Sequence, residues 1–339
     1  MSWPPPEPGT VVDGTRAVGS RSPVVASRAL DTGRATRGLL ALAYLVVLAA
    51  YVIRAGVPLE RPVVLGWLMG ALVIATVGRP DGGVWPVVRD WFPYGVALTA
   101  YDLSRGAADT LGMPLHSRLP IRIDRFVFLG HVPTVDLQRW LGPITSRVAA
   151  WEIPATLVYS THFVVPFLIP AVLWARDRVG FRQWRARFFT LVGAGLTTFA
   201  LLPTVPPWMA SRRGLIGPVR RVSSRGWERL GVGVATRVID LGGRTLNDVA
   251  AVPSLHAAFS LLAVTFCWPR VRARWRPLLA AYPLAMAVTL VATGEHYVFD
   301  VLVGWTYAAA AATWWTRIER RRAVVGASGA ASSPPIPQG

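Results

Sequence analysis

The sequence predicts an all-α fold, a polytopic membrane helix bundle, from its composition and from the spacing of its apolar residues. The chain is 53% hydrophobic with a mean hydropathy of +0.40, and only 16% of its residues are charged, whereas soluble domains have about 25% charged residues. All 36 basic residues are arginine and they give a net charge of +18. They lie mostly between apolar runs rather than on one soluble face, which argues against a nucleic-acid partner.

Eight apolar runs approach the roughly 20 residues that a membrane-spanning helix needs. The third run contains Arg89, Asp90 and Pro93, so a re-entrant or interfacial helix is the alternative there. A single integral membrane domain is expected over 38–317, flanked by disordered cytoplasmic tails at 1–37 and 318–339, which are rich in polar and small residues. The runs are 38–55, 63–78, 84–103, 149–173, 186–203, 252–268, 277–293 and 297–315.

The distribution of arginine predicts how these spans are oriented. Three short segments dense in arginine, 176–187, 270–276 and 317–322, fall on the same side of the predicted map. Cytoplasmic loops are enriched in arginine and lysine, so this side is expected to be the cytoplasm. The loop 204–251 carries eight arginines but is then expected outside. It is either a solvated loop or a basic cover over a site that handles phosphate, because arginine pairs well with phosphate oxygens.

Two short motifs stand at the starts of the last apolar runs, where they would meet water. In the first, Pro253 suits the first turn of a helix, and Ser254 and His256 then lie at a helix N-terminus, which attracts anions. In the second, His296 and Asp300 are four residues apart and share one helix face. A carboxylate on one imidazole nitrogen fixes the tautomer and stabilises charge when the other nitrogen attacks phosphorus.

Other interpretations of these residues have to be weighed against phosphoryl transfer. Interfacial histidines and an ion pair that joins two helices would be purely structural, although ionisable groups in membrane spans are usually functional. Zinc needs three or four closely spaced ligands and magnesium needs several carboxylates, so the sequence predicts neither metal nor cofactor. A transporter would use the same residues as a polar relay, but transporter sites usually lie near the bilayer midplane.

The two motifs resemble the second and third motifs of the type 2 phosphatidic acid phosphatase superfamily. Within it, the chain is most similar to the branch that holds fungal inositol phosphorylceramide synthase and its bacterial relatives. The similarity covers about 84–315, the expected catalytic core. Weaker matches are Tyr101-Asp102-Leu103-Ser104-Arg105, Asp124-Arg125, Pro133-Thr134, Tyr159-Ser160-Thr161-His162-Phe163 and Pro203-Thr204-Val205-Pro206-Pro207-Trp208.

This resemblance implies a fold and a set of roles. The implied fold is a core of six membrane helices, here preceded by two further spans. His296 is expected to attack the phosphoryl group and to become a phosphohistidine, Asp300 to assist it, and His256 to protonate the leaving group. No metal is implied. The remaining residues expected to bind substrate are Ser254, Tyr101, Asp102 and His162, the last of which has a buried, hydrogen-bonded role as its alternative.

The chain departs from the phosphatase pattern in the residues that would hold the phosphate. The arginine expected six residues before His296 is Leu290, and the first motif of the family is absent. These departures favour a transferase over a plain phosphatase. The arginines expected to bind phosphate instead are Arg105 first, and then Arg212, Arg213 and Arg244.

The resulting functional hypothesis is a cell-membrane enzyme whose active site faces away from the cytoplasm. It would move a phospho-headgroup, with inositol phosphate from phosphatidylinositol as one candidate, to a lipid or glycan acceptor. The alternative is a phosphatase acting on a lipid phosphate or a polyprenyl phosphate. Both reactions share the phosphohistidine and differ only in whether an alcohol or water accepts the phosphoryl group.

Overall fold

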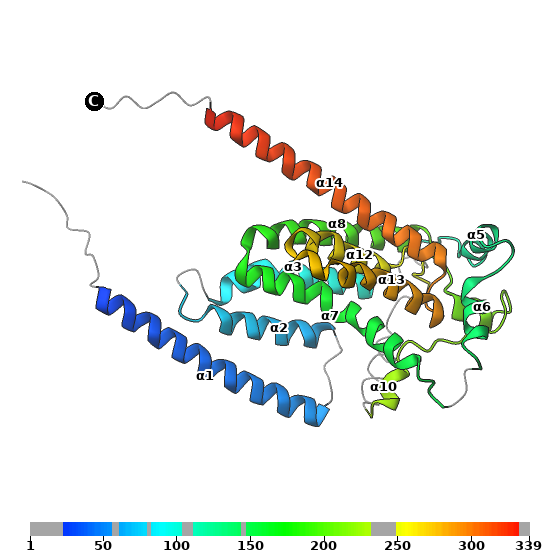
Figure 1. Cartoon of the computed structure of the whole chain (residues 1–339), viewed down its shortest axis with the longest axis horizontal. Helices are drawn as coiled ribbons and strands as arrows, with labels where there is room; N and C mark the ends of the chain where they lie inside the picture. Colours follow the sequence, from blue (N-terminus) through cyan, green and yellow to red (C-terminus); the bar gives the residue numbers. More distant parts are fainter. Residues whose placement is uncertain are drawn as a thin grey trace, which may run out of the picture.

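The structure is a computed structural model, and it describes residues 23–55, 61–79, 83–103, 111–143, 147–231 and 249–331. This part of the chain is helical and contains no β-strand, only two isolated bridges that join Thr204 to His116 and to Ala250. The predicted all-α fold is therefore confirmed (Figure 1).

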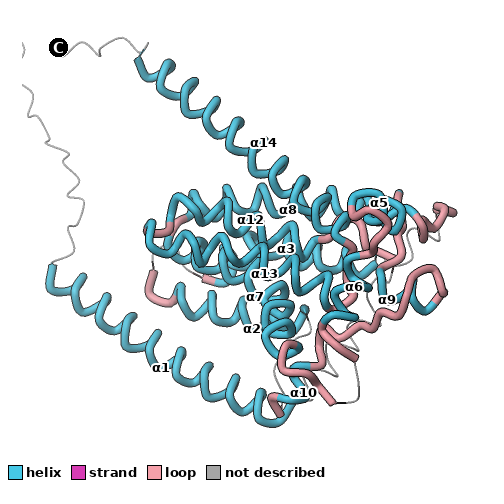
Figure 2. Tube along the Cα trace, turned by 45° about the vertical axis from the view of Figure 1, so that its right-hand side comes forward, coloured by secondary structure: helices cyan, strands magenta, loops and turns pink. Residues whose placement is uncertain are grey.

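Each of the eight predicted apolar runs forms a long helix. Most of these helices run along the same axis of the molecule (Figures 1 and 2), as expected of a membrane bundle. They are α1 (Pro23–Ala55), α2 (Arg61–Thr76), α3 (Val84–Leu103), α7 (Glu152–Arg176), α8 (Arg178–Leu201), α12 (Leu255–Cys267), α13 (Arg276–Ala292) and α14 (Val298–Ala331).

Both terminal helices are longer than the apolar runs that predicted them. Helix α14 continues to Ala331, into the segment 318–339 that was expected to be a tail. Helix α1 begins at Pro23, within the segment 1–37 that was also expected to be a tail. The domain boundaries stay predictions. Arginine, alanine and glutamate are good helix formers, and an established helix extends at low cost. The expectations for residues 1–22 and 332–339 lie outside the described residues.

Short helices gather at one end of the bundle and were not predicted. Figures 1 and 2 show α5 (Leu119–Val127) and α6 (Pro133–Trp140) at this end. Helices α9 (Pro207–Arg212) and α10 (Gly226–Arg229) belong to the arginine-rich loop, so part of that loop is folded. The 3₁₀ turns η2 (Trp268–Arg270) and η3 (Ala273–Trp275) join α12 to α13.

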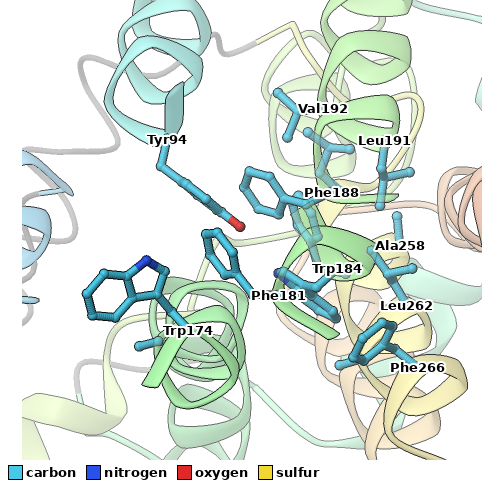
Figure 3. Close-up of a cluster of buried hydrophobic side chains, with 14 of the residues drawn as sticks. Tyr94, Trp174, Phe181, Trp184, Phe188, Leu191, Val192, Ala258, Leu262 and Phe266 are labelled. Atoms are coloured by element: carbon cyan, nitrogen blue, oxygen red, sulfur yellow. The ribbon is translucent and has the colours of Figure 1, made fainter. Parts of the chain in front are cut away.

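The core of the bundle is built from aromatic rings contributed by four helices. Figure 3 shows rings from α3, α7, α8 and α12 packed together, among them Tyr94, Trp174, Phe188 and Phe266. The ring centroids of Tyr94 and Phe188 are 4.9 Å apart, within the usual range for interacting aromatics. Helix α3, whose sequence was the most ambiguous, is one continuous helix that buries Tyr94 and Trp91 completely.

Among the residues that the structure describes, three helical segments are long and apolar enough to cross a membrane: 33–54, 152–176 and 273–292. Helix α12 has only 13 residues, a length of about 20 Å at 1.5 Å per residue. It is shorter than a typical bilayer core and is surrounded by the other helices, with most of its residues buried. The number of spans therefore stays a prediction.

Helices α12 and α14 approach most closely where the two predicted motifs meet. A Cβ atom added at Gly304 would collide with the carbonyl oxygen of Ser254 and lie 3.4 Å from the amide nitrogen of Ala258. In the same region the Ser254 amide donates to the Asp300 carbonyl oxygen at 3.0 Å. The absence of a side chain at Gly304 thus allows the two motif-bearing helices to touch.

Replacing Gly304 by alanine is expected to destabilise the protein by roughly 1–3 kcal/mol, the usual cost of overpacking a core. The matched control is Gly193→Ala, because nothing lies within 4 Å of a Cβ atom at this exposed helical position. Thermal unfolding of the purified protein in detergent would measure both. Equal melting temperatures for the two variants would contradict the close contact.

Candidate active site

The centre of the candidate site is His296, which lies just before α14, together with Asp300 in the first turn of that helix. The Nδ1 atom of His296 lies 3.3 Å from Oδ2 of Asp300. The carboxylate is fully buried and the histidine is 7% exposed. A buried carboxylate at Nδ1 favours the tautomer whose proton is on that nitrogen, which leaves Nε2 available for chemistry.

Backbone groups hold Asp300 in place from two directions. Its Oδ2 atom also accepts from the amide of Tyr297 at 2.9 Å, as an acidic residue near a helix N-terminus commonly does. Its carbonyl oxygen accepts from Ser254 of the other motif. The hydroxyl of Ser254 accepts from the amide of Ala257 at 3.3 Å, and the residue is fully buried. The structure therefore gives Ser254 the role of N-cap of α12, and its contact with substrate stays a prediction.

His256, in the first turn of α12, faces His296 across the site. Their ring centroids are 5.8 Å apart. On its other side, His256 is stacked on rings from α7, with the centroid of His162 at 3.8 Å and that of Tyr159 at 4.8 Å. These contacts orient the His256 ring. The sequence left open whether His162 is buried or contacts substrate, and in the structure it packs directly against His256.

Residues of the short helices fasten the segment that carries His296. Asp124 of α5 accepts from the amides of Val298 at 3.2 Å and of Phe299 at 2.9 Å, so it caps α14 from outside. Thr134, at the start of α6, donates to the carbonyl oxygen of His296 at 3.3 Å. The weaker sequence matches at Asp124 and Thr134 thus converge on the same few residues.

The position of the missing family arginine belongs to the core. Leu290 is fully buried, and it packs in a cluster with Tyr159 and Val301. Its carbonyl oxygen accepts from the amides of Glu295 at 3.0 Å and of His296 at 3.2 Å, which closes the end of α13. An arginine side chain at 290 would place a charge in that apolar cluster.

A loop arginine that the sequence analysis missed lies close to both histidines. The Nε atom of Arg221 donates to Glu295 at 2.8 Å, and Glu295 immediately precedes His296. The guanidinium also bonds the hydroxyl of Tyr159, whose ring stacks on His256. The charge of Glu295 raises the pKa of Arg221 above its already high value, so this residue is a fixed cation. The feature of the sequence that could have pointed to Arg221 is its carboxylate partner Glu295, which directly precedes His296.

The loop around Arg221 is attached to the end of α13 by specific contacts. The side chain of Gln138 donates to the carbonyl oxygens of Arg220 at 2.8 Å and Ala292 at 2.9 Å. The amide of Val222 donates to the carbonyl oxygen of Thr293 at 3.2 Å. Gly294 has a φ of +77°, and a Cβ atom there would lie 2.8 Å from the Arg220 carbonyl oxygen. Glycine is therefore needed at this crossing.

The structure places the other predicted residues less centrally or does not describe them. Arg212 and Arg213 are exposed at the end of α9, and the guanidinium of Arg212 lies 5.6 Å from the ring centroid of Trp208. Arg105 and Arg244 lie outside the described residues. Tyr101 and Asp102 end α3, and their side chains also lie outside the description.

Within the described ranges, no group of three His, Cys, Asp or Glu side chains could hold a metal ion. A second His–Asp pair exists at the surface, where Nδ1 of His131 lies 3.0 Å from Oδ2 of Asp136, but its histidine side chain is 71% exposed. Burial and the facing histidine distinguish the candidate site from this pair. Metal independence stays a prediction.

A helical bundle with two facing histidines, one of them paired with a buried aspartate, defines the class of membrane enzymes that transfer phosphoryl groups of lipids. The profile of the PAP2 superfamily matches residues 122–314, more than half of the chain, and the chain belongs to this superfamily. It is thus a lipid phosphatase or phosphotransferase, and the predicted resemblance is confirmed.

One curated relative and the solved structures complete the comparison. The chain is 28% identical over 165 residues to a phosphoinositol dihydroceramide synthase of Bacteroides thetaiotaomicron, a match that covers 46% of this chain and 52% of that protein. The chain therefore spans about half the length of this relative. No solved structure matches the chain significantly.

The cap that Asp124 places on α14 is expected to make stability depend on pH. Helix α5 lies outside the spanning helices, and burial raises the pKa of Asp124 to about 6, although the amides of Phe299 and Val298 act in the opposite direction. The folded protein then binds this proton more tightly than the unfolded chain, whose Asp pKa is about 4. The free energy of unfolding should therefore fall as pH rises from about 4 to about 6.

Melting temperatures of the parent and of Asp124→Asn, which cannot ionise, would measure this contribution because other titrations cancel in the difference. The parent should lose stability relative to the variant across this pH range. A constant difference, or one of opposite sign, would contradict the raised pKa.

Proposed function

We propose that this enzyme moves a phospho-headgroup from a phospholipid to an alcohol through a phosphohistidine at His296. The observation that carries the proposal is the pair of histidine rings 5.8 Å apart, with a buried carboxylate behind one of them. This arrangement supplies a nucleophile on one side of a phosphoryl group and a proton donor on the other. The buried carboxylate offsets the positive charge that develops on His296.

In the first half of the proposed reaction, the Nε2 lone pair of His296 forms a bond to phosphorus. The bond from phosphorus to the lipid alkoxide breaks as this bond forms. Protonated His256 gives its proton to the leaving oxygen, so a neutral lipid alcohol departs. The contact of His296 with Asp300 and the stack of His256 on His162 support this assignment, because each holds its imidazole ring in place.

In the second half, an acceptor hydroxyl oxygen forms a bond to phosphorus as the N–P bond breaks. His256, now neutral, takes the hydroxyl proton and returns to its starting state. With an alcohol the product is a new phosphodiester, and with water it is a free phosphate ester. The departure from the phosphatase pattern at Leu290 favours the alcohol.

Arg221 is the cation that we propose for the phosphoryl oxygens. A phosphoryl group that gains charge in the transition state needs fixed positive donors. Glu295 and Tyr159 hold this guanidinium beside the two histidines, so little ordering is required on binding. Arg105, Arg212, Arg213 and Arg244 remain candidates for a second contact.

The donor that we propose is phosphatidylinositol, with a long-chain lipid alcohol as acceptor. The support is the relative in Bacteroides thetaiotaomicron, whose name gives phosphoinositol and dihydroceramide. The test uses phosphatidylinositol labelled in the inositol phosphate, with and without dihydroceramide. Transfer of label to the lipid acceptor supports the proposal, release of water-soluble inositol phosphate would make the enzyme a hydrolase, and absence of both reactions would exclude this donor.

Replacing His296 by alanine is expected to abolish turnover and the labelled covalent intermediate, which can be trapped on the parent at alkaline pH. His256→Ala should slow turnover by about 10²–10⁴-fold, as loss of a general acid does. His131→Ala removes the exposed His–Asp pair and is the matched control with full activity. Full activity of His296→Ala would exclude the mechanism.

Replacing Arg221 by glutamine is expected to lower kcat/KM. The decrease should correspond to a loss of roughly 2–4 kcal/mol of transition-state stabilisation, as removal of one preorganised donor causes. Because this change leaves Glu295 unpaired, the double variant Arg221→Gln/Glu295→Gln tests whether the loss is only structural. It should remain slow although its fold is restored. Arg139→Gln, at a side chain that is 73% exposed and has no proposed contact with substrate, provides the control, and an Arg221 variant within twofold of the parent would assign the phosphate contact elsewhere.

We propose that the active site faces away from the cytoplasm. The basis is the location of the three arginine-dense segments, which are expected on the cytoplasmic side. In a Cys267→Ser background, cysteine at Leu230, which is 45% exposed, should react with an impermeant thiol reagent in intact cells. Cysteine at the exposed Ala273 in the segment 270–276 should react only after lysis. The reverse pattern would invert the topology.

A further inference from the structure

A second cluster of arginines surrounds a pocket at the end of the bundle away from the histidines. The pocket has a volume of about 740 Å³ and lies between α3 and α8, where Arg89, Arg178, Arg182 and Arg185 line it together with Asp90. Trp174, which bonds Asp90, is 15 residues from Tyr159 of the active site along α7. At 1.5 Å per residue this separation is roughly 22 Å, so the two sites lie at different ends of α7.

One carboxylate is shared among these arginines. Asp90 is 8% exposed and accepts from the indole of Trp174 at 2.8 Å, from Arg89 at 3.1 Å and from Arg178 at 3.3 Å. A guanidinium nitrogen of Arg185 lies 3.8 Å from Oδ1 of Asp90. Among the residues that line the pocket, four positive charges therefore face a single negative one.

These arginines lie at the N-terminal end of α8. Arg178, Arg182 and Arg185 occupy the first eight residues of this helix, whose N-cap is Asp177 and whose first turn carries no acidic residue. The carboxylate of Asp177 accepts from the amide of Gly180 at 2.8 Å, and the positive end of a helix dipole disfavours cations there. An anion in the pocket would offset both the excess charge and the dipole, and guanidinium groups pair best with phosphate or carboxylate.

The two helices that line the pocket also expose apolar side chains. Trp85 and Phe92 of α3 and Val179 of α8 are 72%, 66% and 55% exposed. Tryptophan is enriched at the membrane–water boundary, and exposed apolar side chains there suit acyl chains. The volume of the pocket also exceeds that of a bare phosphate and falls within the range of small-molecule sites.

We infer that this pocket binds a phosphate group, presented by the headgroup of an anionic phospholipid in the leaflet opposite the active site or by a free phosphate ion. The guanidinium groups that Asp90 leaves partly unsatisfied bond the phosphate oxygens, and exposed apolar side chains of α3 and α8 accommodate the acyl chains when the ligand is a lipid. The site is separate from the proposed catalytic pair and does not depend on it.

The test measures binding of phosphatidylglycerol to the full-length protein in detergent by native mass spectrometry. The double variant Arg182→Gln/Arg185→Gln should lose one bound lipid, with affinity reduced at least fivefold. The matched control Arg272→Gln/Arg274→Gln removes the same charge from exposed arginines of the segment 270–276 and should bind like the parent. Asp90→Asn should bind more tightly than the parent, a gain that misfolding would not produce.

Inorganic phosphate at millimolar concentration separates the two sources of the ligand. If it binds and displaces the lipid from the parent, the pocket recognises the bare anion. If phosphatidylglycerol stays bound, the headgroup and chains of the lipid are required. If the pocket variant and the control variant bind lipid and phosphate equally, and Asp90→Asn gains nothing, the inference is overturned and the arginines serve only to neutralise Asp90.

Discussion

The arrangement of the active-site end depends on the burial of one carboxylate, that of Asp300. A buried carboxylate is expensive unless hydrogen-bond donors surround it. Asp300 obtains two such donors, both at Oδ2, from the ring of His296 and the amide of Tyr297, whereas its buried Oδ1 has no hydrogen-bond partner among the described residues. The carbonyl oxygen of Asp300 ties down the start of α12. These contacts fix one histidine directly and position the helix that carries the other.

The helices of the bundle and the contact between the motif residues could be predicted from the sequence, because both depend on local sequence patterns. Apolar runs predicted the eight long helices, and a spacing of four residues predicted the contact between His296 and Asp300. The positions of His256 and His296 at the starts of apolar runs were likewise visible in the sequence. In each of these cases the deciding information lies within a few residues of the chain, which is why periodicity and spacing were sufficient.

The parts that escaped prediction depend on contacts between distant segments. Helices α5 and α6 are too short and too polar to appear as apolar runs, although they carry Asp124 and Thr134 to the site. Arg221 could not be distinguished from the other loop arginines, because what sets it apart is its contact with Glu295, which is 74 residues away. The start of α1 was placed too late and the end of α14 too early, because helices continue beyond their apolar parts.

The burial of Leu290 has a consequence for how such a protein can change its chemistry over time. An arginine at position 290, near the end of α13, and Arg221 in the folded loop, as we propose, would be two solutions to the same electrostatic problem, but they place different demands on the neighbouring residues. Replacing Leu290 by arginine would put a charge beside Tyr159 and Val301, at a penalty of several kcal/mol. Exchanging one arrangement for the other would therefore require the surrounding core to change as well.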